Sequence, residues 1–172
     1  YIERKLFTIN TGHAAIAYLA YQKGIKDICT AMKNLDIAAM ARLVWQETSE
    51  LLVRKYGFDR AAHEKYVITA EKRFSSPYIS DDVTRVARGP VRKLSVRDRL
   101  TSPALQLMEQ GVTAEALAAV IAAALHFDYA GDQEAVEVQR YIKEHGMAEA
   151  ISHFTEIPAN SKLYALIEQK SA

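Results

Sequence analysis

The sequence predicts an all-α fold. Hydrophobic residues recur with a period near 3.6 along nearly all of the 172 residues, which is the spacing produced by one face of an α-helix. No alternating run is long enough to indicate a strand, and the seven glycines are too well separated to form a glycine-rich phosphate-binding turn. Hydrophobic residues make up 49% of the chain, enough for a substantial core. We therefore expect one multi-helix domain over residues 1–172.

The first half of the chain is expected to contain three main helices. They cover the opening residues up to about 23, then 37–56, then 60–74. Each is followed by a residue that ends helices, namely Gly24, Gly57 and Pro77 in that order. Asp36 precedes the second helix and is the expected N-cap.

The second half begins with an irregular stretch, residues 75–103, that reads as turns and short helices. Regular helices are then expected at 104–110, 113–127, 132–145, 147–153 and 161–169. Thr113 is the expected N-cap of the second of these, and Gly146 ends the third. No repeat or long linker divides the chain.

Composition narrows the classes of function. A formal charge of +1 gives no general preference for nucleic acid or a membrane surface, and the longest apolar stretch, residues 114–127, is shorter than the roughly 20 residues that span a bilayer. The single cysteine, Cys29, falls on a helical apolar pattern, which favours a buried thiol in a reducing, cytoplasmic setting. The chain opens without Met or a signal sequence, and we expect it to be a fragment.

The opening helix carries a polar set that is unusual for a core helix. At about 100° per residue, Asn10 lies about 140° and His13 about 80° from Lys5, so the three share one side. Gly12 destabilises a helix by about 1 kcal/mol relative to Ala, which suggests that another group approaches the backbone there.

This set could perform acid–base chemistry on an alcohol. A lysine screened from water has a lowered pKa and can accept a proton, while an Asn amide can donate to the developing alkoxide and a His can orient a neighbouring hydroxyl. The alternative is a solvated Lys5, an Asn10 that caps a late-starting helix, and a core His13.

A basic loop follows in the irregular region. Residues 85–99 hold six cations and one anion, a local charge of +5, so the rest of the chain sums to −4. Arginine forks suit bidentate phosphate binding. One alternative is a solvated turn region with ordinary surface charges, and another is a surface that binds an acidic partner. Neighbouring acidic residues and the lack of aromatic residues in the loop argue against binding of nucleic acid. The cations are Arg85, Arg88, Arg92, Lys93, Arg97 and Arg99.

Two segments resemble a known family. The run from Lys5 to His13 is similar to the K-x4-N-x2-H signature of the polyol-specific long-chain dehydrogenases, closest to the branch that acts on mannitol 1-phosphate. Residues 74–86 resemble that family's N-P-Y-x-x-D-x-x-x-R-V run. The chain departs from the pattern R-K-L-S-P-N-D-R-L, because Val96 and Arg97 stand where the family has Pro and Asn.

The resemblance implies a helical, C-terminal substrate-binding domain of an NAD-dependent dehydrogenase that interconverts D-mannitol 1-phosphate and D-fructose 6-phosphate without a metal. It implies Lys5 as general base, with Asn10 and His13 polarising the reacting group. Arg85 and Lys93 would contact the polyol, and Arg92 and Arg99 are candidates for the phosphate. NAD would be bound mainly by an N-terminal Rossmann domain that this chain lacks, so the fragment alone is expected to be inactive. Alternatives are an unphosphorylated polyol or hexuronate as substrate, or a non-catalytic helical module.

Overall fold

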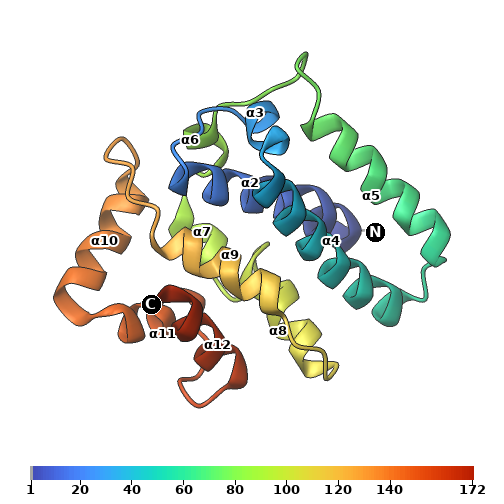
Figure 1. Ribbon diagram of the computed structural model, residues 1–172. Coiled ribbons are helices and arrows are strands. Elements are labelled where there is room, and N and C mark those ends of the chain that lie inside the picture. Colours follow the sequence, from blue (N-terminus) through green and yellow to red (C-terminus); the bar gives the residue numbers. More distant parts are fainter. Residues whose placement is uncertain (1) are drawn as a thin grey trace. The chain divides into compact units, whose positions relative to one another are not determined.

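The computed structural model describes residues 2–172, and the regular structure of these residues is helical, with a single isolated antiparallel bridge between Asp27 and Asp82 (Figure 1). The predicted all-α class is confirmed. The chain forms two compact units, one ending at Val86 (unit 1) and the other beginning at Ala87 (unit 2).

Unit 1 contains the helices of the first half of the chain. Its elements are α1 (Ile2–Lys5), the π-helical turn η1 (Leu6–Asn10), α2 (Thr11–Gln22), α3 (Ile28–Lys33), α4 (Leu35–Tyr56), α5 (Arg60–Phe74) and α6 (Val83–Val86). The first three run without a break as one helix from residue 2 to residue 22. Gly24 follows with a φ of +71°, a left-handed conformation that ends this helix as expected.

The core of unit 1 lies between the first helix and α4. Small residues make most of the buried face of α2, so α4 can approach closely and insert Trp45 against it. The indole is 2% exposed. Cys29 in α3 is also buried, as expected, and its thiol donates to the Ser75 carbonyl at 3.4 Å.

The start of α4 differs from the prediction. Asn34, not Asp36, is the N-cap, and its Oδ1 accepts from the backbone N–H groups of Asp36 and Ile37 at 3.0 and 3.1 Å. The helix therefore begins two residues earlier, and Asp36 occupies its first turn, where its charge complements the helix dipole. The predicted stop at Gly57 is confirmed by its φ of +68°.

Unit 2 is built around one apolar helix. Its elements are α7 (Pro90–Leu94), α8 (Thr101–Glu109), α9 (Glu115–Leu125), α10 (Gln133–His145), α11 (Met147–Thr155) and α12 (Lys162–Ser171). All but two residues of α9 are buried, because α12, α8 and α7 pack around it. A helix that is apolar on every side forms the centre of a domain, and α9 does so here (Figure 1).

Two boundaries in unit 2 were predicted incorrectly. Thr113 does not cap α9; the helix begins at Glu115 after Ala114, which has no side-chain capping bond. α8 begins at Thr101, three residues before the predicted start, and Pro103 lies inside its first turn, where a missing N–H is tolerated. The predicted stop of α10 at Gly146 is confirmed.

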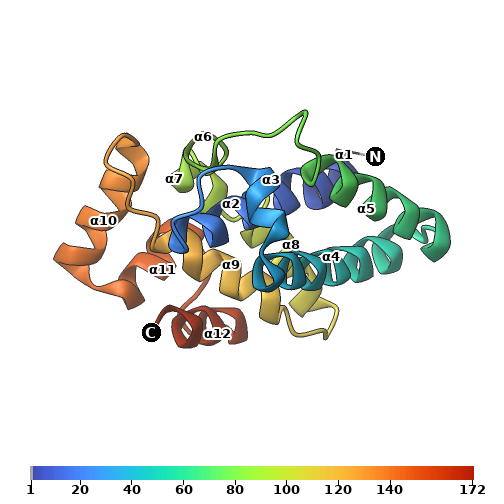
Figure 2. The ribbon, with the colours of Figure 1, turned by 45° about the horizontal axis from the view of Figure 1, so that its top comes forward.

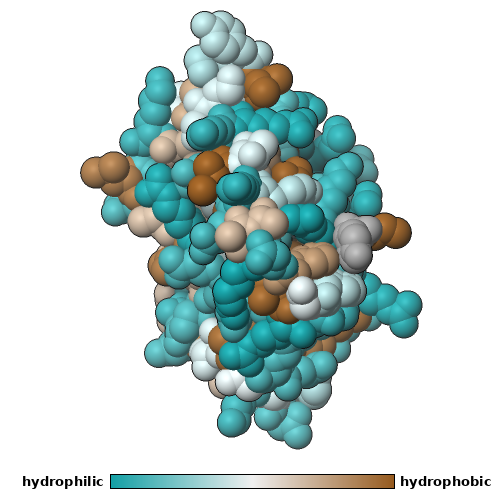
Figure 3. Space-filling model, turned by 90° about the vertical axis from the view of Figure 1, so that its right-hand side faces the viewer, coloured by the Kyte–Doolittle hydropathy of each residue, from teal (hydrophilic) through white to brown (hydrophobic). Residues whose placement is uncertain are grey.

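No helix within residues 2–172 is long and apolar enough to cross a membrane. On the face drawn in Figure 3, hydrophobic residues are scattered singly or in small groups among hydrophilic ones. Scattered apolar side chains of this kind are usual on protein surfaces.

Candidate functional site

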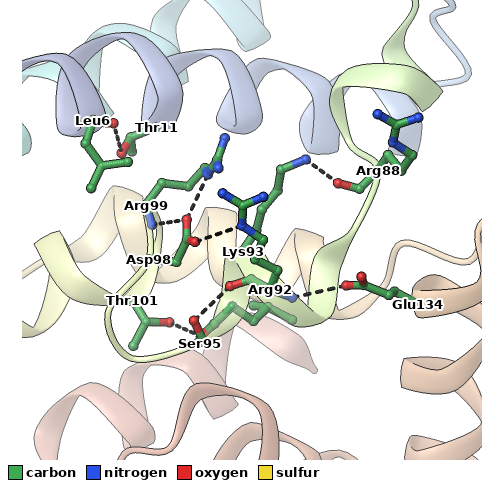
Figure 4. Close-up of polar contacts among 11 residues, drawn as sticks. Leu6, Thr11, Arg88, Arg92, Lys93, Ser95, Asp98, Arg99, Thr101 and Glu134 are labelled. Atoms are coloured by element: carbon green, nitrogen blue, oxygen red, sulfur yellow. Dashed lines mark hydrogen bonds and ion pairs between the residues drawn. The ribbon is translucent and has the colours of Figure 1, made fainter.

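The first helix changes geometry at the predicted polar set. Residues Leu6–Asn10 form a π turn, and the Thr11 backbone N–H donates to the carbonyl of Leu6, five residues earlier. The Thr11 hydroxyl donates to the same carbonyl at 3.1 Å (Figure 4). A π turn holds more residues than an α turn, so Lys5 and Asn10 lie closer to one side of the helix than the 140° expected from α geometry. Single π turns within α-helices are frequent at functional sites.

The helix continues without a break through Asn10, which bears on the alternative that Asn10 caps a late-starting helix. Asn10 has helical angles, φ −70° and ψ −42°, and makes no side-chain capping bond. The interpretation of Asn10 as the cap of a late-starting helix is therefore wrong. Its side chain is half-buried, and Asn10 lines a surface pocket of about 400 Å³ together with Lys5, Ile2 and Leu6.

Lys5 is exposed in this chain. The screening from water that a lysine base requires is thus not supplied by unit 1 itself. Glu3, two residues earlier, is engaged elsewhere, since its Oε1 accepts from Lys55 at 2.7 Å and from Tyr56 at 2.6 Å.

Gly12 allows a close approach, as the sequence suggested. A Cβ placed on Gly12 would lie 2.5 Å from Nε1 of Trp45. The same indole nitrogen donates to the Thr8 carbonyl inside the π turn at 2.9 Å. Trp45 therefore packs directly on the backbone of the segment that carries the polar set and fixes its position.

His13 is held by an aromatic stack and an acid. Its ring lies parallel to that of Phe74, with centroids 4.7 Å apart, and Phe74 in turn lies parallel to Trp45 at 6.3 Å. His13 Nε2 is 3.4 Å from Oδ2 of Asp81, and the side chain is 26% exposed. His13 is therefore not a core histidine. It lines a pocket of about 440 Å³ with Asp81 and the exposed residues Tyr78 and Ile79.

Arg85 reaches the same acid from the other side. Its Nη2 donates to Oδ1 of Asp81, an i, i+4 pair in which Asp81 precedes α6 and Arg85 lies within it. Asp81 therefore connects two predicted site residues, His13 and Arg85, that are 72 positions apart in the sequence.

The loop that carries Asp81, residues 75–82, runs from the end of α5 to α6 (Figure 2) and is fastened to the start of α3. The Ile28 N–H donates to the Asp81 carbonyl at 3.0 Å, and the Val83 N–H donates to the Lys26 carbonyl at 2.9 Å. Ser80 donates to Asp27, the N-cap of α3, at 3.1 Å. The backbone of Asp81 is thus fixed on both sides.

The remaining predicted site cations, Arg92, Lys93 and Arg99, lie in unit 2, and two of them, Arg92 and Arg99, share the carboxylate of Asp98. Arg99 donates through Nε to Oδ1 of Asp98 at 2.8 Å, and Nε of Arg92 lies 3.6 Å from Oδ2 (Figure 4). Burial opposes ionisation of Asp98, but hydrogen bonds from Arg99 and the charges of Arg99 and Arg92 together lower its pKa. Asp98 stays ionised and orders two guanidinium groups beside each other.

Lys93 is the buried cation of this group. It is 9% exposed, and its amine donates to the Arg88 carbonyl (Figure 4). Burial, reinforced by the charge of Arg99, lowers the pKa of Lys93 to about 8. The turn before it is held by α10, since Asp132 accepts from the Gly89 N–H at 2.9 Å and Glu134 accepts from the Arg92 N–H at 3.1 Å.

Sequence reasoning missed Asp81 and Asp98 as parts of the site. Each was counted only as a negative charge near the basic loop. The i, i+4 spacing of Asp81 and Arg85 was a usable signal, because such pairs meet on a helix. The contacts of Asp132 and Glu134 with the basic loop span more than forty residues and have no local signal.

The sequence resemblance indicated an all-helical domain with a polar first helix and a basic loop, and the structure has this class of fold. Comparison with known proteins identifies the family. The model of the mannitol dehydrogenase C-terminal domain matches residues 1–172. The chain belongs to this family.

Individual relatives agree with the family. The chain is 49% identical over 171 residues to a mannitol-1-phosphate 5-dehydrogenase of Brevibacillus brevis and 46% identical over 170 residues to that of Bacillus subtilis. Each match covers 99% of this chain but only 44% of the relative. Among solved structures, Pseudomonas fluorescens mannitol 2-dehydrogenase in complex with NAD and D-mannitol has the same fold, with a TM-score of 0.76 at 23% identity, over 99% of this chain and 37% of that chain.

Proposed function

We propose that this chain is the substrate-binding and catalytic domain of an NAD-dependent dehydrogenase that interconverts D-mannitol 1-phosphate and D-fructose 6-phosphate. The proposal rests chiefly on Lys5 and Asn10 lining one pocket across a π turn, with His13 on the same helix held in place by Asp81. The identity of 46–49% to mannitol-1-phosphate 5-dehydrogenases supports the choice of substrate.

In this proposal Lys5 removes the hydroxyl proton of the sugar alcohol, and the Asn10 amide donates to the oxygen as it gains negative charge. His13 and Arg85 bind neighbouring hydroxyls. For Lys5 to act as a base, the bound substrate and a further part of the polypeptide must cover its exposed side chain, because removal of water disfavours the charged form of an amine.

The cofactor belongs to another part of the protein. A dinucleotide needs a glycine-rich turn between a strand and a helix, and residues 2–172 contain none. We therefore assign NAD to an N-terminal Rossmann domain of the same polypeptide. When bound there, NAD supplies the hydride acceptor.

We assign the phosphate to the cations of unit 2. Arg92 and Arg99 are ordered side by side by Asp98, so little side-chain entropy remains to be lost on binding an anion. Lys93, with a pKa of about 8, is mostly protonated at neutral pH and adds a third positive charge. Arginine forks with a lysine point charge suit a compact dianion.

The first test measures NADH formation from mannitol 1-phosphate by the full-length polypeptide. Lys5→Ala should lower kcat by about 10²- to 10⁴-fold, the usual contribution of a general base. Lys72→Ala, which removes an equally exposed lysine of α5, serves as the control and should keep the wild-type rate. An unchanged kcat in Lys5→Ala would contradict the proposal and favour a non-catalytic module.

The second test separates the phosphorylated substrate from an unphosphorylated polyol. Arg99→Ala should raise KM for mannitol 1-phosphate by about tenfold or more, because it removes one charge-assisted hydrogen bond to the phosphate. The low rate on mannitol, which has no phosphate, should stay unchanged. Equal rates of the wild-type enzyme on the two substrates would instead support the unphosphorylated alternative. The isolated 172-residue chain should give no turnover.

A further inference from the structure

We propose that Asp81 is a positioning residue that holds His13 and Arg85 in one arrangement for the sugar alcohol. This inference rests on the proposed function and deepens it, because Asp81 would act through two substrate-binding groups and would not touch the reacting atoms.

The carboxylate of Asp81 is shared between two elements. Oδ2 faces Nε2 of His13 at 3.4 Å, and Oδ1 accepts from Nη2 of Arg85. His13 belongs to α2 and Arg85 to α6, and these two helices pack against each other. A single side chain therefore sets the spacing between a histidine and an arginine that the sequence brings from distant positions.

Asp81 limits the movement of both of its partners. Stacking on Phe74 at 4.7 Å sets the plane of the His13 ring, and the contact of Nε2 with Asp81 restricts the rotation of the ring within that plane. Arg85 is 59% exposed, and its long side chain is mobile without an anchor. The Asp81 carboxylate contacts both side chains and restricts both movements.

Asp81 itself is rigidly placed. Its carbonyl accepts from the Ile28 N–H at 3.0 Å, and its neighbour Ser80 donates to Asp27 at 3.1 Å and accepts from the Cys29 N–H, also at 3.1 Å. The side chain is 33% exposed beside a pocket that it lines with His13. A charged group that is fixed by its backbone but accessible at a pocket suits an organising role better than a purely structural one.

The test uses Asp81→Asn in the full-length polypeptide, which keeps the size of the side chain and removes its charge. We expect KM for mannitol 1-phosphate to rise about tenfold or more, which corresponds to a coupling of about 1.4 kcal/mol between contacting residues. KM for NAD should stay unchanged. Asp81→Glu should restore much of the loss, and Asp82→Asn, the same change at an exposed neighbouring position, should have no effect.

Coupling to the partners decides between positioning and structure. In a His13→Ala and Arg85→Ala background, adding Asp81→Asn should change KM by less than about twofold, because its two partners are already gone. The proposal is overturned if Asp81→Asn lowers kcat with both KM values unchanged, if its effect persists in that background, or if the variant does not fold by circular dichroism. If the wild-type polypeptide itself does not oxidise mannitol 1-phosphate, the proposed function fails instead.

Discussion

The packing of Trp45 on Gly12 can be tested by Gly12→Ala. On helix propensity alone the change should stabilise the chain by about 1 kcal/mol. The added Cβ would, however, lie 2.5 Å from Nε1 and 2.8 Å from both Cε2 and Cζ2 of Trp45, where ordinary contacts are about 3.5–4.0 Å. The indole would have to move by about 1 Å.

That movement is opposed by two contacts. Trp45 is 2% exposed, donates to the Thr8 carbonyl at 2.9 Å and is stacked with Phe74. Overpacking a core usually costs about 1–3 kcal/mol, and a lost hydrogen bond costs about 0.5–1.5 kcal/mol. After the gain in propensity is subtracted, we expect Gly12→Ala to lower the free energy of unfolding by about 1–3 kcal/mol.

Urea unfolding followed by far-UV circular dichroism measures this difference. The matched experiment repeats Gly12→Ala in a Trp45→Phe background, where the smaller ring leaves room for the Cβ and the loss should disappear. A Gly12→Ala chain that is as stable as the wild type, or more stable, would refute the argument that the indole limits this position.

Two further predictions concern buried ionisable groups. His63 is 1% exposed, and within residues 2–172 neither of its ring nitrogens has a hydrogen-bond partner. Because unsatisfied buried polar atoms destabilise a fold, His63→Phe should raise the free energy of unfolding by about 1–3 kcal/mol. Urea unfolding measures this difference. Burial, together with the charge of Arg4, lowers the pKa of His63 in the folded chain. Below about pH 6.5 the unfolded wild-type chain therefore binds more protons than the folded one, and the wild type loses stability. The stability of His63→Phe relative to the wild type should accordingly increase as pH falls through that value. The pKa of Lys93 is lowered from 10.5 to about 8, so the unfolded chain binds more protons between these values and stability should rise with pH across that window. The rise, up to about 3 kcal/mol, should be absent in Lys93→Met; identical pH dependence in the two proteins would contradict the burial of the charged amine.

Helix type and most helix ends were predictable from the sequence, because both depend on nearby residues. The apolar period identifies α4, α5 and α10, and Gly57 and Gly146 end two of them as expected. The errors arose where two local signals compete. Asn34 and Asp36 are both good capping residues, and only the extended backbone of Asn34, with ψ 123°, selects the first.

The sequence indicated candidate residues for the site but not how they are arranged. The spacing of Lys5, Asn10 and His13 indicated a shared side of one helix, but nothing in the local sequence indicated the π turn. Its Thr8 carbonyl accepts from Trp45, which is 37 positions away in the sequence. Gly12 was the one local sign of that approach. The bridging role of Asp81 depends on a loop that is held by α3, a tertiary effect that the periodicity of a single helix cannot reveal.

The π turn also shows how this segment can accommodate a change in length. Removing one residue between Lys5 and Asn10 would let residues 2–22 continue as a regular α-helix with better hydrogen-bond geometry. After this deletion seven residue steps would separate Lys5 from His13, and at about 100° per step the two residues would lie about 20° apart around the helix axis. The π turn therefore accommodates one extra residue while Lys5 and His13 stay on one side of the helix.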